Sequence, residues 1–198
     1  MKLLEITVFT SLLIFLSACQ SVPERSLPDT QGEQAVLHAT ASGKAAVTGE
    51  VTYEQKTCNP SRMQIANLVD LQRYTVSKDT LTVIPEGSYI AYFLECGDHY
   101  WSIKGELANI RDDMKSLLVF PTFSVKAGEI INIGQISFDL VEKGGLLSVE
   151  KHAPVAREPR PQTSVTLAKY YPALSGKIVV RKAKTALTPT LQERMINQ

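Results

Sequence analysis

Two cysteines and a histidine are the residues of this chain whose types and spacing best suit metal binding. Cys96-Gly97-Asp98-His99 places a thiol and an imidazole three positions apart, and Cys58 lies upstream. Thiolates and imidazoles are ligands that zinc and copper prefer. A closed zinc site needs four ligands, and no fourth candidate stands at a useful spacing. We therefore expect no metal or other cofactor, and we expect His99 to be a surface residue.

Residues that could perform catalysis are few and scattered. The chain contains no Gly-x-Ser-x-Gly turn, no Walker-type phosphate loop and no dinucleotide-binding fingerprint. Its three histidines, His38, His99 and His152, stand far apart. Asp112 and Asp113 are adjacent carboxylates, which more often indicate a solvated loop than acid–base chemistry. We expect no catalytic residue, and a hydrolase built around His99 and Asp112 is the third-ranked hypothesis.

The third cysteine, Cys19, ends a short apolar stretch. Residues 6–18 are mostly apolar, and Lys2 supplies a positive charge before them. This stretch is shorter than the roughly 18–20 residues that cross a hydrocarbon core. A short apolar stretch that ends in small residues is typical of a signal peptide. The sequence therefore predicts a signal peptide over 1–18; the alternative is an uncleaved N-terminal anchor with a chance cysteine.

The residues Leu16-Ser17-Ala18-Cys19 resemble the lipobox of bacterial lipoproteins. The resemblance implies that Cys19 carries a thioether-linked diacylglycerol and usually a third, amide-linked acyl chain. Each buried CH₂ contributes about 0.8 kcal/mol, so two or three chains would anchor the protein firmly. Gln20 follows, where an aspartate favours inner-membrane retention in enterobacterial lipoproteins. The resemblance thus implies attachment to the outer membrane, facing the periplasm.

Lipidation of Cys19 would leave Cys58 and Cys96 as the remaining thiols in an oxidising compartment. An even number of thiols in an exported domain indicates disulfide pairing. Both cysteines stand beside turns, Cys58 before Asn59-Pro60 and Cys96 before Gly97-Asp98. We therefore predict a Cys58–Cys96 disulfide worth roughly 3–4 kcal/mol in the chain-entropy model. The competing metal site with His99 would need both thiols free.

Short β-branched and aromatic segments separated by turns fill the middle of the chain. This pattern predicts a β-sandwich of about seven antiparallel strands over residues 45–150. The expected strands include 74–76, 81–84, 88–94 and 99–103, followed by the segments 117–120 and 123–125. The strand over 88–94 is expected to be central because it is apolar on both faces. Residues 61–68 favour a short helix, although a loop is nearly as well supported.

A long bent strand is expected over 130–141. Ile136, Phe138 and Leu140 alternate with polar residues, and Gly134 suits a β-bulge at which the strand bends. Lys143-Gly144-Gly145 then predicts a hairpin turn into a strand over 146–149.

The two ends of the chain differ from this middle part. Residues 19–44 are polar and predict a flexible tether. Residues 151–162 contain three prolines and predict a linker, which opens a basic, partly helical segment over 151–198. In that segment Thr163 or Ser164 is expected to cap a helix over 165–171, and Thr188-Pro189 is expected to start another. Residues 178–180 are read as a strand or a docked extended segment.

Aromatic residues gather at Tyr89, Tyr92, Phe93, Tyr100 and Trp101. Stacked aromatic rings could bind sugars, but a small sandwich also needs such side chains to fill its core, and the core interpretation is preferred. Tyr170 and Tyr171 lie on the predicted late helix. These two tyrosines either dock that helix on the sandwich or contact a partner.

Charge is unevenly distributed along the chain, although the formal net charge is only +1. Residues 19–141 contain ten Lys/Arg against fifteen Asp/Glu, and residues 142–198 contain ten against four. Nucleic acid is excluded as a partner by the predicted export. Arg181, Lys182 and Lys184 could contact anionic lipid headgroups, lipopolysaccharide or peptidoglycan carboxylates, or could simply belong to a solvated tail.

The turns Ile84-Pro85-Glu86-Gly87-Ser88-Tyr89 and Val125-Lys126-Ala127-Gly128-Glu129 resemble those of transthyretin-like and carboxypeptidase-regulatory-like sandwiches, including many in uncharacterised lipoproteins. The resemblance covers 45–149 and implies no catalytic residue. The leading hypothesis is a lipid-anchored, non-catalytic structural or assembly module that binds another envelope protein. The alternative is a module that binds carbohydrate or peptidoglycan.

Overall fold

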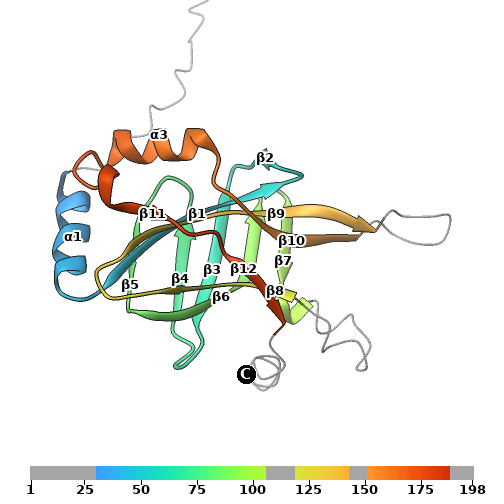
Figure 1. The fold of residues 1–198 in the computed structure, drawn as a ribbon. Coiled ribbons are helices and arrows are strands. Elements are labelled where there is room, and N and C mark those ends of the chain that lie inside the picture. The colour runs from blue at the N-terminus through green and yellow to red at the C-terminus, as the bar shows by residue number, and fades with distance from the viewer. Residues whose placement is uncertain (1–29, 106–118, 143–150, 188–198) are drawn as a thin grey trace, which may run out of the picture.

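The computed structural model describes residues 30–105, 119–142 and 151–187. Twelve strands lie within these ranges and form two packed sheets (Figure 1). This confirms the predicted β-sandwich with short helices in its C-terminal part, although the strands outnumber the seven expected. Cys19, Asp112 and Asp113, the predicted strand over 146–149 and the predicted helix after Thr188 all lie outside the described residues.

Sheet A follows the order β10-β9-β1-β2, with β5 also paired to β1 and β11 also paired to β9. Its strands are β1 (Ala45–Tyr53), β2 (Lys56–Thr57), β5 (Thr82–Ile84), β9 (Ile130–Glu142), β10 (Lys151–Arg157) and β11 (Ile178–Val180). β9 runs parallel to both β1 and β11, whereas the sequence pattern predicted antiparallel strands throughout. Parallel neighbours need a long crossover. Here the chain between β1 and β9 makes that crossover by building most of the other sheet.

Sheet B follows the order β12-β8-β6-β3-β4, with β7 also paired to β6, and all its pairs are antiparallel. Its strands are β3 (Ser61–Asn67), β4 (Arg73–Ser77), β6 (Gly87–Cys96), β7 (His99–Ser102), β8 (Val119–Val125) and β12 (Lys184–Leu187). The predicted central position of residues 88–94 is confirmed, because β6 pairs with β3, β7 and β8.

The expected helix or loop over 61–68 is wrong, because residues 61–67 form β3. Met63 and Ile65 are fully buried, while Arg62 is exposed and Gln64 is half-buried. This period-two alternation fits a strand. Pairing with β4 on one side and β6 on the other satisfies the backbone groups of β3 and decides its conformation.

The main core lies between the two sheets. It includes inward residues of β1 and β9 from sheet A and of β3 and β6 from sheet B. Its largest fully buried members include Met63, Ile65, Tyr89, Leu94, Phe120, Ile131, Ile133 and Ile136. Each of these strands therefore contributes one face to a shared apolar layer.

Two helices pack in a second apolar cluster on sheet A, and one of them replaces part of the predicted tether. α1 (Thr30–Ala41) buries Val36, and α3 (Pro161–Tyr170) buries Leu167, both in a cluster that also contains Ile130 of β9. Glu33 of α1 also accepts a hydrogen bond from the Ala173 amide at 2.8 Å. The prediction of a flexible tether over 19–44 is thus wrong from residue 30 onward.

The predicted linker over 151–162 is also wrong, because residues 151–157 form β10 at the edge of sheet A. Pro154 is tolerated there since an edge strand has one side without ladder hydrogen bonds. α3 begins at Pro161, four residues before the predicted start at residue 165, with Arg160 and not Thr163 or Ser164 at the N-cap position. Residues 178–180 form β11, which resolves the open choice in favour of a strand. The segment 151–187 therefore belongs to the sandwich domain, beyond the predicted boundary at 150.

Candidate functional site

The basic residues of the C-terminal part lie where the chain crosses from sheet A to sheet B. β11 pairs with β9 in sheet A, and β12 pairs with β8 in sheet B. Between them, the backbone amide of Arg181 donates to the carbonyl of Asn132 at 2.9 Å. Arg181, Lys182 and Lys184 are therefore held by strand pairing, not carried on a solvated tail.

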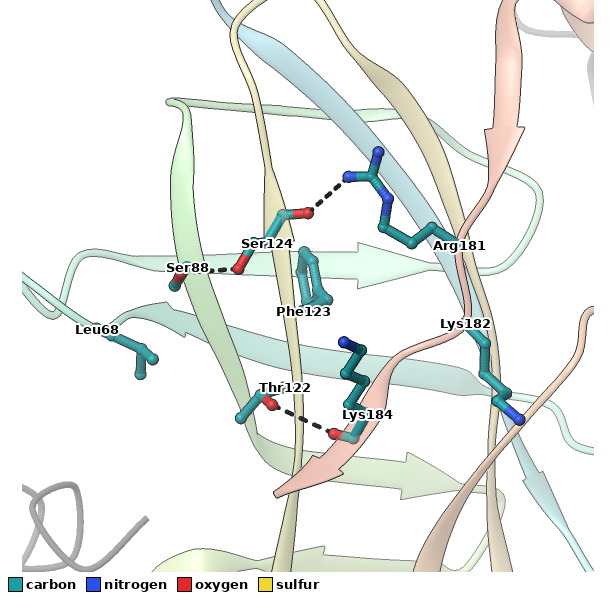
Figure 2. Close-up of a pocket in the computed structure, with 8 residues that line it drawn as sticks. All are labelled: Leu68, Ser88, Thr122, Phe123, Ser124, Arg181, Lys182 and Lys184. Atoms are coloured by element: carbon teal, nitrogen blue, oxygen red, sulfur yellow. Dashed lines mark hydrogen bonds between the residues drawn. The ribbon is translucent and has the colours of Figure 1, made fainter. Parts of the chain in front are cut away.

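A groove opens beside this crossing, with a volume of about 250 Å³ (Figure 2). We call it the basic groove; its lining residues are Leu68, Ser88, Thr122, Phe123, Ser124, Arg181, Lys182 and Lys184. The ring of Phe123 is 6% exposed, and the Ser88 and Ser124 hydroxyls lie 2.8 Å apart. The basic groove thus combines a buried aromatic ring, hydroxyl groups and basic side chains.

Arg181 is committed to an ion pair within the protein. Its guanidinium donates to both carboxylate oxygens of Glu129, at 2.7 and 2.8 Å, and to the carbonyl of Ser124 at 3.0 Å. These bonds from Arg181, together with the backbone amide of Lys126, lower the pKa of Glu129 to about 2. The pair stays charged at neutral pH and fixes the crossing against β8. Arg181 therefore has a structural role within the domain, and its contact with an anionic surface stays a prediction.

The two lysines keep more of their charge for solvent or a ligand. Among the described residues, the carboxylate nearest to Lys182 is that of Glu158, at a long distance of 3.7 Å, and the side chains of Lys182 and Glu158 are both well exposed. Lys184 is exposed and has no carboxylate partner within the part of the chain that the structure describes. In Figure 2 its side chain extends beside Phe123. Lys184 is thus the uncompensated cation of the basic groove.

This arrangement suits binding better than proton transfer. The residues that line the basic groove include no carboxylate, histidine or cysteine. General acid–base chemistry needs a group whose pKa lies near the working pH, and lysine and arginine side chains at a surface do not provide one. A lysine above an apolar floor, with hydroxyls alongside, can instead hold a carboxylate and the carbon skeleton that carries it.

The sequence left open whether Tyr170 and Tyr171 dock α3 on the sandwich or contact a partner. In the structure both tyrosines pack α3 onto the sandwich. Tyr171 is 5% exposed, and its hydroxyl oxygen accepts a hydrogen bond from the Leu81 amide at 3.3 Å. Tyr170 is half-buried against the same apolar cluster as Leu167. Tyr171 is therefore an internal residue of the domain in this structure.

The predicted Cys58–Cys96 disulfide is present, with the two Cα atoms 4.9 Å apart. Because both thiols are bonded to each other, neither can ligate a metal with His99. No cluster of three or more His, Cys, Asp or Glu side chains with metal-binding geometry occurs among residues 30–105, 119–142 and 151–187.

The aromatic cluster expected from the sequence divides into two environments. Tyr89 and Trp101 are buried in the core, whereas Tyr100 is 77% exposed. Sequence reasoning missed a further association, in which the Tyr53 ring stacks on the imidazoles of His99 and His152. These three residues come from β1, β7 and β10, so no local spacing could have indicated their contact.

Comparison of the chain with family models, curated proteins and solved structures finds no match. Among the described helices, none has the length and apolar character needed to span a bilayer.

Proposed function

We propose that this protein is a lipid-anchored envelope module that binds another protein and performs no catalysis itself. The lipobox sequence supports an anchor at Cys19 on the periplasmic face of the outer membrane. The basic groove supports the binding role, with a carboxylate-bearing extended segment of the partner as its occupant.

The observation that carries this proposal is the uncompensated charge of Lys184 beside an apolar floor. A carboxylate from a partner would pair with its ammonium group, and the apolar part of the same segment would cover Phe123 and Leu68. Of the two other cations that line the groove, Arg181 is neutralised by Glu129, whereas Lys182 has a long contact of 3.7 Å with Glu158 and can add to the positive charge.

The position of β12 adds a backbone component. Within the described strands β12 pairs with β8 alone, so it forms one end of sheet B. An extended peptide can add to such an edge through main-chain hydrogen bonds while its side chains enter a neighbouring groove. This mode suits a module that recognises a segment of another protein.

Site-specific photo-crosslinking in cells tests the proposal. A photoreactive residue replaces Ser88, which lines the basic groove without supplying its charge, in the full-length protein. The control position is Lys56, an exposed residue on β2 of the other sheet. We expect one discrete adduct from position 88 and none of that mass from position 56. Identical patterns from the two positions, or no adduct from either, would contradict the proposal.

Charge reversal gives an independent measurement. In the absence of crosslinking, Lys184→Glu should weaken binding of the partner identified above by about tenfold, equivalent to about 1.4 kcal/mol, as measured by copurification. Lys56→Glu should leave this binding unchanged. Co-sedimentation of the protein with purified sacculi, lost in Lys184→Glu, would favour peptidoglycan as the ligand in place of a protein.

A further inference from the structure

A second hollow, of about 310 Å³, lies where the turn between β6 and β7 approaches β1 and β10. It is separate from the basic groove and shares no lining residue with it. Its walls and rim are mainly aromatic rings, imidazoles and one carboxylate, provided by Tyr53, Asp98, His99, Tyr100, Trp101 and His152. We call it the aromatic hollow.

Ring stacking organises one wall of the aromatic hollow. The rings of Tyr53 and His99 have centroids 3.9 Å apart and are nearly parallel, at 10°. The His152 ring stacks on Tyr53 at 4.9 Å, and its Nε2 lies 3.0 Å from the Tyr53 hydroxyl oxygen. Three side chains from three strands thus form one stack of rings, with His152 tilted by 30° against Tyr53.

The rim presents polar groups that remain free to bind. Asp98, His99 and Tyr100 are all exposed, and Tyr100 is 77% exposed. Within the described part of the chain these three side chains form no hydrogen bond or ion pair. A carboxylate, an imidazole and a phenol together can accept and donate hydrogen bonds to vicinal hydroxyl groups.

The rim is held rigidly before any ligand arrives. Cys96 immediately precedes this turn and is bonded to Cys58, and the Gly97 amide donates to the carbonyl of Pro60 at 2.9 Å. Trp101, which follows Tyr100, is 7% exposed and anchors β7 in the core. Because this backbone is already fixed, binding needs to order only exposed side chains such as that of Tyr100, and this small entropy cost favours a weakly held ligand such as a sugar.

We propose that the aromatic hollow binds an uncharged pyranose ring of a glycan. Aromatic faces such as that of Tyr100 pack on the apolar C–H face of a sugar, and the rim groups bind its hydroxyls. Neither lysine nor arginine lines the hollow, whereas the carboxylate of Asp98 does. A phosphorylated sugar is therefore disfavoured by charge. This binding does not depend on the protein-binding role of the basic groove.

Intrinsic fluorescence measures the binding directly, because Trp101 is the only tryptophan of the chain and lines the hollow. Purified full-length protein in detergent is titrated with the neutral tetramer of N-acetylglucosamine, with maltotetraose and with glucose 6-phosphate. We expect a saturable change with a neutral tetramer at a Kd of about 1 mM or below, and at least about tenfold weaker binding of glucose 6-phosphate. The neutral tetramer that binds more tightly identifies the type of glycan.

Variants of Tyr100 separate stacking from a general effect on the fold. Tyr100→Ala should weaken binding by about tenfold or more, whereas Tyr100→Phe, which keeps the ring, should stay within about twofold of the parent. Thermal unfolding should be the same for both variants, since Tyr100 is exposed. The proposal is overturned if neither neutral tetramer gives a saturable signal, if Tyr100→Ala binds as the parent does, or if glucose 6-phosphate binds equally well.

Discussion

Among single residues, Glu50 best illustrates how this fold stabilises a buried charge. Its side chain is 1% exposed on the outward side of β1, where Thr48 and Thr52 are also buried. The guanidinium of Arg160 binds both of its carboxylate oxygens, and Lys78 Nζ lies 3.5 Å away. A buried carboxylate is tolerated only when such partners replace its lost hydration. Arg160 directly precedes α3, so this pair also holds the start of that helix against sheet A.

We expect Arg160→Ala to lower the free energy of unfolding by about 3 kcal/mol, because it leaves the buried carboxylate of Glu50 largely uncompensated. The matched control is Arg62→Ala, which breaks a pair with Glu95 in which Arg62 is 54% exposed; its cost should stay below about 1 kcal/mol. Urea denaturation of both variants gives the comparison. Equally small losses of unfolding free energy in both variants would show that Arg160 is not required to stabilise the buried carboxylate of Glu50.

Among the elements, β9 connects most parts of the fold, and it does so by bending. Asn132 pairs with Thr48 and Gln135 with Glu50, so β9 holds one more residue than β1 over this interval. Gly134 lies in the extra stretch with φ +82°, which confirms the bulge expected there. The bend lets β9 pair with β11 at its start and with β10 further along.

Gly134→Ala should destabilise the domain by about 3 kcal/mol or more. A Cβ at this position would lie 2.2 Å from the carbonyl oxygen of Arg157 on β10, in addition to the cost of a positive φ. Gly43→Ala is the matched control, because Gly43 has φ +87° but a Cβ there would meet nothing within 4 Å; it should cost about 1 kcal/mol. Chemical denaturation curves for the two variants test this, and similar losses would argue against a steric role of the bulge.

At the scale of the whole molecule, the helices pack on sheet A, and β11 and β12 add one strand to each of the two sheets. α1, from the N-terminal part of the chain, and α3, from its C-terminal part, both pack their apolar side chains on sheet A. Because α1 begins at Thr30, only residues 20–29 separate the described domain from Cys19. Ten residues reach no more than roughly 36 Å even when fully extended, so an anchor at Cys19 would keep the domain near its membrane.

Lipidation is the prediction that belongs to this scale. Metabolic labelling with palmitate should mark the protein, and Cys19→Ser should abolish the label because the acceptor thiol is lost. The double variant Cys58→Ser/Cys96→Ser should keep the label, since those thiols form the disulfide. A labelled Cys19→Ser protein would refute the lipoprotein interpretation.

Local patterns in the sequence were sufficient for several features of the fold. Period-two alternation and turn residues predicted the strands around β6, the bulge at Gly134 and the sandwich class, since these depend on neighbours a few positions apart. Thiol parity, together with the lipobox, predicted the Cys58–Cys96 pair. Patterns of this kind state which faces of an element are apolar, but they do not state what covers its polar face.

Only the tertiary structure decided the features that depend on contacts between distant segments. Arg181 is neutralised by Glu129, Tyr171 is buried beside Leu81, and proline-containing residues 151–157 pair with β9 as a strand. The aromatic hollow brings Tyr53, His99 and His152 together from three strands. In each case the deciding free energy comes from desolvation and from pairing with a partner elsewhere in the chain, 9 to 22 residues away for β10 on β9 and 46 or more residues away for the side-chain contacts. Propensity and periodicity within one segment carry no information about such a partner.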